Sequence, residues 1–135
     1  MKTIIVDTKI DSSIDTVWEY WTEPEHIVNW NFAIPEWYCP QAENNLEVGK
    51  SFSFRMEARD GSMGFDYEGT YTKIEPTSSI EYALGDGRKV SIDFKNEVDA
   101  VSIVETFDVE DTNTLEQQKQ GWQAILDNFK KYVES

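Results

Sequence analysis

The sequence predicts an α+β domain in which one antiparallel sheet packs against a long C-terminal helix. Between residues 48 and 109, apolar and polar residues alternate over consecutive short segments, which is typical of an antiparallel sheet with one buried face. Over residues 114–133, apolar residues recur every three or four positions, as on one face of an amphipathic helix. The chain has 135 residues, enough for one hydrophobic core, so we expect a single domain over 1–135.

The N-terminal segment is predicted to hold one strand and two short helices. Residues 3–10 have the composition of a strand, and residues 11–13 offer helix caps for an amphipathic helix that follows to Trp21. Thr22 with Glu25 forms a capping-box pattern, which predicts a second short helix that ends near Trp30.

Residues 31–45 are expected to form a long loop, because they contain two prolines and show no clear period. Loops of this length are uncommon and often functional. This one carries Phe32, Trp37 and Tyr38, so we expect it to fold back on the body of the domain or to cover an opening.

Five further strands are predicted, at residues 48–59, 64–74, 80–84, 88–95 and 101–109. Asp60-Gly61 is a hairpin turn signal, and further turn signals separate the later strands. With the N-terminal strand, the sheet should hold about six strands, with the C-terminal helix covering its buried face.

The C-terminal helix should begin after Thr114, which forms a capping box with Gln117. Two residues on its apolar face are unusual there, Gln118 and Gly121. A glycine inside a helix costs about 1 kcal/mol relative to alanine, and a buried glutamine needs hydrogen-bond partners. We therefore expect a helix that leaves room beside Trp122 instead of closing tightly on the sheet.

The composition excludes several classes of function. The chain has 26 acidic and 12 basic side chains and a formal net charge of −14, which repels phosphate backbones and anionic lipids. We expect no nucleic-acid partner and no membrane partner, and no apolar run is long enough to span a bilayer. The N-terminus lacks a signal-peptide pattern, and a single cysteine allows no internal disulfide, so a cytoplasmic location is expected.

Few residues could support catalysis or metal binding. The sequence has one histidine, His26, and one cysteine, Cys39, with no zinc-ligand spacing and no phosphate-binding glycine motif. A Cys–His pair is formally possible, but no third orienting group is visible. We therefore expect a solvated His26, a partly buried loop cysteine, no metal, no cofactor and no catalytic residue.

Glu105 is the unusual residue of the predicted sheet. By strand parity it shares the buried face with Ile103 and Phe107, where a carboxyl must pair, hydrogen-bond or raise its pKa. It could anchor a ligand or act as a general acid or base, it could bond Gln118 or a tyrosine hydroxyl, or a bulge could turn it outward. Since most buried polar groups are satisfied internally, the structural role is favoured over the ligand role, and catalysis is favoured least.

The order of several short motifs resembles a known family. These motifs are Val17-Trp18, Thr22-Glu23-Pro24-Glu25, Trp30, Gly49, Asp60-Gly61, Gly69-Thr70-Tyr71, Ile74-Glu75-Pro76, Glu105-Thr106-Phe107 and Gly121-Trp122. In this order and spacing the chain resembles the START-like SRPBCC superfamily, and within it the bacterial stand-alone branch of the activator of heat-shock protein 90 ATPase homologue-like family. The resemblance implies a helix-grip (START-like, Bet v 1-like) fold, in which a curved antiparallel sheet grips the C-terminal helix around a cavity.

The resemblance implies no single activity, because its relatives include lipid, hormone and polyketide binders, cyclases and a eukaryotic co-chaperone domain. We expect non-enzymatic binding of a small hydrophobic molecule, aromatic or lipid-like. The alternatives are a co-chaperone-like interaction module, which the lack of a separate N-terminal domain makes less favoured, and a cyclase-type enzyme that uses Glu105. A dense aromatic core without a cavity is the structural alternative.

The predicted ligand site combines four groups of residues. The helix supplies a roof, the strands a floor, and the loop a movable lip, while two polar residues orient the ligand. The roof is Trp122, Ile125 and Phe129, the floor is Phe54, Tyr67, Tyr71, Ile92 and Phe94, the lip is Phe32, Trp37 and Tyr38, the polar residues are Glu105 and Gln118, and Trp30 completes the set.

Overall fold

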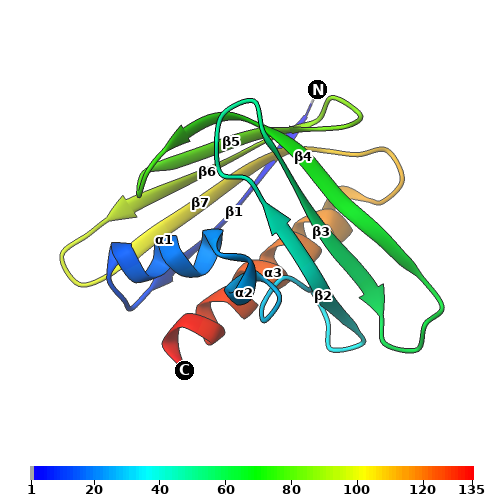
Figure 1. Cartoon of the computed structure of the whole chain (residues 1–135), viewed down its shortest axis with the longest axis horizontal. Coiled ribbons are helices and arrows are strands. Elements are labelled where there is room, and N and C mark those ends of the chain that lie inside the picture. The colour runs from blue at the N-terminus through cyan, green and yellow to red at the C-terminus, as the bar shows by residue number, and fades with distance from the viewer. Residues whose placement is uncertain (1) are drawn as a thin grey trace.

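A computed structural model describes residues 2–135 as one curved antiparallel sheet wrapped around a long C-terminal helix (Figure 1). The elements follow the order β1 (Thr3–Ile10), α1 (Ile14–Thr22), α2 (Pro24–Ile27), β2 (Trp37–Asn44), β3 (Ser51–Ala58), β4 (Gly64–Glu75), β5 (Ser79–Leu84), β6 (Lys89–Asn96), β7 (Val101–Asp108) and α3 (Leu115–Glu134). This is the predicted α+β helix-grip fold, with seven strands in the described part of the chain instead of about six.

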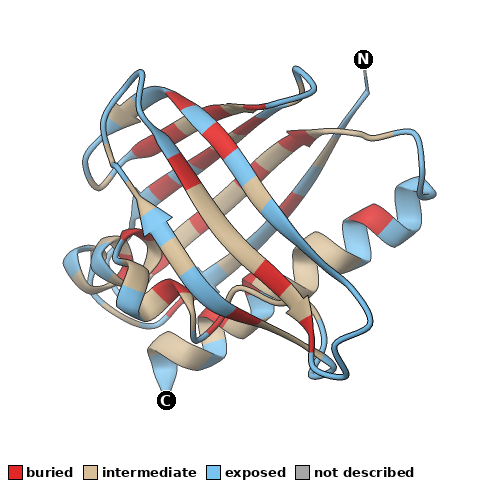
Figure 2. Ribbon diagram, turned by 45° about the vertical axis from the view of Figure 1, so that its right-hand side comes forward, coloured by how far each residue is buried: buried red, intermediate tan, exposed pale blue. Residues whose placement is uncertain are grey.

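The sheet has the strand order β1-β7-β6-β5-β4-β3-β2. Strands β2 to β7 are therefore neighbours in chain order, and β1 is added at the far edge beside β7. Turn glycines allow the tight connections, since Gly61 (φ 78°) and Gly87 (φ 92°) adopt a left-handed backbone that side chains disfavour. β1 pairs with β7 antiparallel, which places Val6 opposite Glu105. Buried residues recur along the strands in alternation with more exposed ones, as expected for a sheet with one inner face (Figure 2).

The predicted loop over 31–45 is wrong in its second half, because Trp37–Asn44 forms the edge strand β2 and pairs with β3. The register of this pair shifts between Tyr38 and Gln41, on either side of Pro40. A proline cannot donate to the strand ladder and is found at edges and bulges. The same irregularity hides the two-residue period, which is why the sequence does not reveal this strand.

The two short helices follow the prediction only in part. Ser13 caps α1, and its hydroxyl accepts a hydrogen bond from the Thr16 amide at 3.2 Å. The capping box expected at Thr22 is wrong, since the Thr22 hydroxyl donates back to the Trp18 carbonyl at 2.8 Å. α2 begins at Pro24 without a side-chain cap and ends at Ile27.

Helix α3 begins with the predicted capping box. The Thr114 hydroxyl accepts from the Gln117 amide at 3.1 Å, and the Gln117 side chain accepts from the Thr114 amide at 3.0 Å. The helix lies against β1, where Gln123 donates to the Asp7 carbonyl at 3.0 Å. The helix is therefore fixed to one edge of the sheet, and the rest of the curved sheet wraps around it (Figure 1).

Gln118 is not a ligand-facing residue but closes the loop between β7 and α3. Its Nε2 donates to the carbonyls of Glu110 (3.1 Å) and Asn113 (2.8 Å), and its Oε1 accepts from the Glu110 amide (2.9 Å). The buried amide is thus satisfied by backbone groups of its own loop, as buried polar groups usually are.

Candidate functional site

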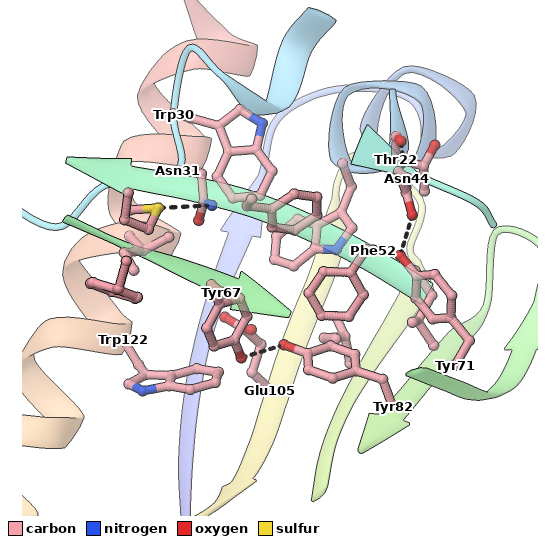
Figure 3. Close-up of a pocket in the computed structure, with 17 residues that line it drawn as sticks. Thr22, Trp30, Asn31, Asn44, Phe52, Tyr67, Tyr71, Tyr82, Glu105 and Trp122 are labelled. Atoms are coloured by element: carbon pink, nitrogen blue, oxygen red, sulfur yellow. Dashed lines mark hydrogen bonds between the residues drawn. The ribbon is translucent and has the colours of Figure 1, made fainter. Parts of the chain in front are cut away.

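A cavity of about 230 Å³ lies between the inner face of the sheet and helix α3 (Figure 3). Nine of the seventeen side chains that line it are aromatic, and the others are mostly aliphatic or amide side chains. The lining residues are Trp21, Thr22, Trp30, Asn31, Asn44, Phe52, Phe54, Met56, Phe65, Tyr67, Tyr71, Ile80, Tyr82, Ile92, Glu105, Trp122 and Ile125.

Strands β3 and β4 form one wall of the cavity through their paired register. Phe54 lies opposite Tyr67, and Phe52 lies opposite Gly69. A Cβ atom on Gly69 would come within 2.8 Å of the Phe52 ring. The ring therefore lies across the glycine, and any larger residue at Gly69 would displace it.

The lining of the cavity reaches the surface next to the β3–β4 hairpin, where Phe65 is 50% exposed. Trp37 packs against the Phe65 ring with the centroids 5.9 Å apart.

The structure brings eight of the predicted site residues together around the cavity. They come from α3, from four strands of the sheet and from the segment after α2. These residues are Trp30, Phe54, Tyr67, Tyr71, Ile92, Glu105, Trp122 and Ile125.

Two predicted residues belong to the core beside the cavity and do not line it. Phe129 is 0% exposed, and its ring packs edge-to-face against Trp21 and Trp30. Phe94 makes the same kind of contact with Trp18 and Trp21. Helix α1 therefore fills the space that the prediction had assigned to a ligand.

The three residues predicted to form a movable lip do not line the cavity. The Tyr38 hydroxyl donates to Glu57 at 3.3 Å, and Trp37 reaches Phe65 at the rim but not the cavity. Phe32 does not line the cavity, and its carbonyl accepts a hydrogen bond from Asn128. The lining of the cavity therefore includes none of the predicted lip residues, and of the two predicted polar residues it includes Glu105 but not Gln118.

Gly121 does not enlarge the cavity either. A Cβ atom placed on it would meet no other atom within 4 Å, yet the residue is not part of the lining. The room beside Trp122 that the sequence suggested thus exists, but it lies outside the cavity.

Nine lining residues were not among the predicted site residues. Phe52 and Met56 share strand parity with Phe54, so the sequence contained a signal for both. Phe65 and Tyr82 were identifiable only as aromatic residues on strands. Ile80 shares strand parity with Tyr82 on β5, so the sequence contained a signal for it too. The remaining four gave no signal, because they come from the end of α1, the segment after α2 and the irregular strand β2: Trp21, Thr22, Asn31 and Asn44.

The polar groups at one end of the cavity satisfy one another. The Tyr71 hydroxyl donates to Asn44 Oδ1 at 2.5 Å, and Asn44 Nδ2 donates to the Thr22 carbonyl at 2.7 Å. Burial raises the pKa of the Tyr71 hydroxyl, so this residue stays protonated. This chain of bonds ties β4, β2 and α1 together at the cavity wall.

A second polar pair joins Tyr67 and Tyr82, whose hydroxyls lie 2.8 Å apart. Desolvation raises the pKa of both hydroxyls, so both remain neutral. One hydroxyl donates to the other, which leaves one proton of the pair free for a further acceptor.

Glu105 faces inward, as strand parity predicts, and it is only 5% exposed. It sits in an unbroken register opposite Ile92 and Val6, which rules out the outward bulge. Gln118, one of the internal partners considered for this carboxyl, bonds its own loop. Instead, the Glu105 carboxyl lines the cavity beside the Tyr67–Tyr82 pair (Figure 3).

Within residues 2–135 no group donates a hydrogen bond to the Glu105 carboxyl, and burial alone raises its pKa to about 8. A carboxyl without hydrogen bonds is costly in a protein interior. No fully buried side-chain oxygen or nitrogen of the described residues lacks a partner, so the Glu105 carboxyl is not sealed in the interior but faces the cavity, where an occupant can reach it.

The single cysteine and histidine take no part in the cavity. Cys39 is 2% exposed on β2, more buried than expected, and burial raises the pKa of its thiol. His26 is not simply solvated, because its ring stacks on Tyr20 and its Nδ1 lies 2.7 Å from the Tyr132 hydroxyl. Neither residue contacts the other among the described interactions, and no cluster of metal-binding side chains is found in this part of the chain.

No helix within the described residues combines the length and the apolar character that crossing a bilayer requires. This agrees with the absence of a long apolar run in the sequence.

The comparisons with known proteins agree with this geometry. Residues 11–134 match the family described as "Activator of Hsp90 ATPase homolog 1-like protein" (AHSA1). The chain belongs to the AHSA1-like family. The AHSA1-like protein of Aeromonas hydrophila has 41% sequence identity and a TM-score of 0.92, with 98% of this chain and 92% of that chain covered. A Cytophaga hutchinsonii protein has 48% identity and a TM-score of 0.86 over the same shares of the two chains.

More distant structures share the fold. A Chromobacterium violaceum protein has 18% identity and a TM-score of 0.87, with 98% of this chain and 97% of that chain covered. Among curated proteins, none gives a significant match. The AHSA1-like fold is therefore assigned, and function has to be argued from the cavity of this chain.

Proposed function

We propose that this AHSA1-like protein binds one small, largely aromatic molecule in the cavity and does not convert it chemically. The observation that carries the proposal is a ring-lined cavity that contains one buried carboxyl without a hydrogen-bond partner. Ligand sites are typically apolar concavities with a few polar groups that fix orientation. A fully packed scaffold would have no reason to keep such a carboxyl.

The size of the cavity narrows the class of ligand. An apolar cavity of about 150 Å³ accepts benzene, so a cavity of about 230 Å³ suits a molecule of about two fused rings. A sterol or a long acyl chain would need far more space. Of the two ligand types expected from the sequence, this favours the aromatic one over the lipid-like one.

Binding can be tested with indole and 2-naphthol by recording amide chemical shifts of the labelled protein. We expect shifts that centre on the strands and helix around the cavity. Ile125→Trp should abolish them by filling the cavity, and Ile125→Leu, which conserves volume, should keep them. If neither compound shifts amide signals around the cavity, in the parent protein or in Ile125→Leu, the proposal is contradicted.

A second candidate is an interaction with a chaperone ATPase, which the description of the matching family favours. Two exposed apolar side chains at the β3–β4 hairpin, Met63 (65% exposed) and Phe65, offer a contact surface. The ATPase rate of a bacterial Hsp90 should then rise on addition of the protein and fall back with Met63→Ser. An unchanged rate removes this candidate. Both candidates assume the cytoplasmic location expected from the sequence.

A further inference from the structure

We propose that the ligand of the cavity is an organic amine, with a protonated ammonium group against Glu105 and its apolar part among the rings. This inference rests on the proposed binding function and specifies its ligand class. It depends on three features: the Glu105 carboxyl without a hydrogen-bond partner, the aromatic lining of the cavity and the negative net charge of the protein.

Glu105 is the only carboxyl among the described residues that line the cavity, and no protein group within residues 2–135 donates a hydrogen bond to it. The other polar lining side chains already have partners: Thr22 bonds a backbone carbonyl, Asn31 bonds the Met56 sulfur, and Asn44 bonds Tyr71. An ionised carboxyl can only accept hydrogen bonds, and an ammonium group can only donate them. When Glu105 is ionised, an ammonium group therefore supplies the opposite charge that no described lining side chain provides.

The rings next to Glu105 suit a cation. A cation over the face of tryptophan or tyrosine is attracted by the ring quadrupole, and tryptophan is the best partner. Trp122 stacks on Phe107 with centroids 3.9 Å apart, and Phe107 does not line the cavity. The indole therefore meets the cavity with its other face or its edge, near Tyr67 and Glu105 (Figure 3).

The charge of the protein disfavours anionic ligands. The net charge is −14, and of the described residues that line the cavity none is Lys, Arg or His. A ligand carboxylate would meet Glu105 with no cation to compensate it. A cationic ligand is attracted by the field of the whole protein, which raises the rate of association.

Binding of a cation couples to the protonation of Glu105. Because burial raises its pKa to about 8, the empty site is mostly protonated at neutral pH and must lose that proton to pair with an ammonium. The titratable groups that face it are the neutral hydroxyls of Tyr67 on β4 and Tyr82 on β5, with Arg88 and Asp86 acting on Tyr67 from the β5–β6 turn. The neighbours on the other packed elements are not titratable: Val6 on β1, Ile92 on β6, and Trp122 and Ile125 on α3.

Three indole compounds of similar size separate the possibilities: tryptamine, the neutral tryptophol and the anionic indole-3-acetate. Isothermal titration calorimetry from pH 6 to 9 should rank tryptamine first. Its affinity should rise by up to about tenfold per pH unit and level off above about pH 8. In two buffers of different ionisation enthalpy at pH 7, the titration should show release of close to one proton per tryptamine.

The variant Glu105→Gln keeps the shape of the site and removes its charge. We expect it to weaken tryptamine binding at least about thirtyfold at pH 8.5, the usual range for loss of a buried charged partner, and to leave tryptophol binding within about twofold. Glu105→Asp, which keeps the charge, should retain the preference for tryptamine. Circular dichroism establishes that each variant is folded.

The outcomes are distinguishable. Tryptophol binding as tightly as tryptamine, or tryptamine affinity unaffected by Glu105→Gln, overturns the amine inference and leaves the binding function standing. Affinity that falls as pH rises also overturns it, because the carboxyl would then act as a donor to a neutral acceptor. Binding of none of the three compounds counts against the proposed function itself.

Discussion

Glu105→Gln should make the stability of the folded protein less sensitive to rising pH. The folded state raises the pKa of Glu105 from 4.5 to about 8, so between these values the folded protein holds a proton that the unfolded chain releases. Unfolding then releases a proton, and stability falls as pH rises through this window. One pKa unit corresponds to about 1.4 kcal/mol, so Glu105 should remove about 3 kcal/mol of stability between about pH 5 and pH 8.

Urea denaturation followed by circular dichroism, at pH values from 5 to 8, measures this effect. The advantage of Glu105→Gln over the parent protein should grow by about 3 kcal/mol across the series. Glu68→Gln is the matched control, since it makes the same substitution at an exposed position on β4 and so separates the effect of the buried site from the loss of one acidic side chain. Parallel stability curves for the parent and Glu105→Gln would show that the folded protein does not perturb this carboxyl.

Three further changes test the packing of α3. Gly121→Ala should stabilise the protein by about 0.5–1 kcal/mol, because the new Cβ meets open space and the helix gains propensity; a loss of stability would mean that the site is crowded. Phe129→Ala should cost about 3–5 kcal/mol, since a fully buried ring against Trp30 is replaced by a void; a cost below about 1 kcal/mol would contradict this packing. Thr114→Ala should cost about 1 kcal/mol by removing the acceptor of the Gln117 amide, and an unchanged urea midpoint would show that the cap is unimportant.

Most of the architecture could be predicted because it depends on local patterns. Short stretches of sequence are enough to indicate the alternating strands and the capping box at Thr114, and the structure contains both. Strand β2 was missed because Pro40 and the adjacent register shift remove the period on which the prediction depends. The missing seventh strand was therefore a failure of local signal and not of the fold class.

The cavity was less predictable, because its boundary depends on which side chains pack into the core and which are left to line the cavity. The sequence could place Phe94 and Phe129 on inward faces, but it could not show that Trp21 of α1 packs against both. Burial of Glu105 followed from parity alone. The absence of a hydrogen-bond partner for Glu105 could not be predicted, because it depends on Gln118 bonding to backbone groups of its own loop.

Three of the five tryptophans of the chain, Trp21, Trp30 and Trp122, border the cavity. Their emission responds to the polarity and the quenchers within van der Waals reach, so the protein contains its own optical reporter of occupancy. A non-fluorescent guest would change the spectrum without any attached dye. Large compound collections could therefore be screened on the unmodified protein in a plate reader.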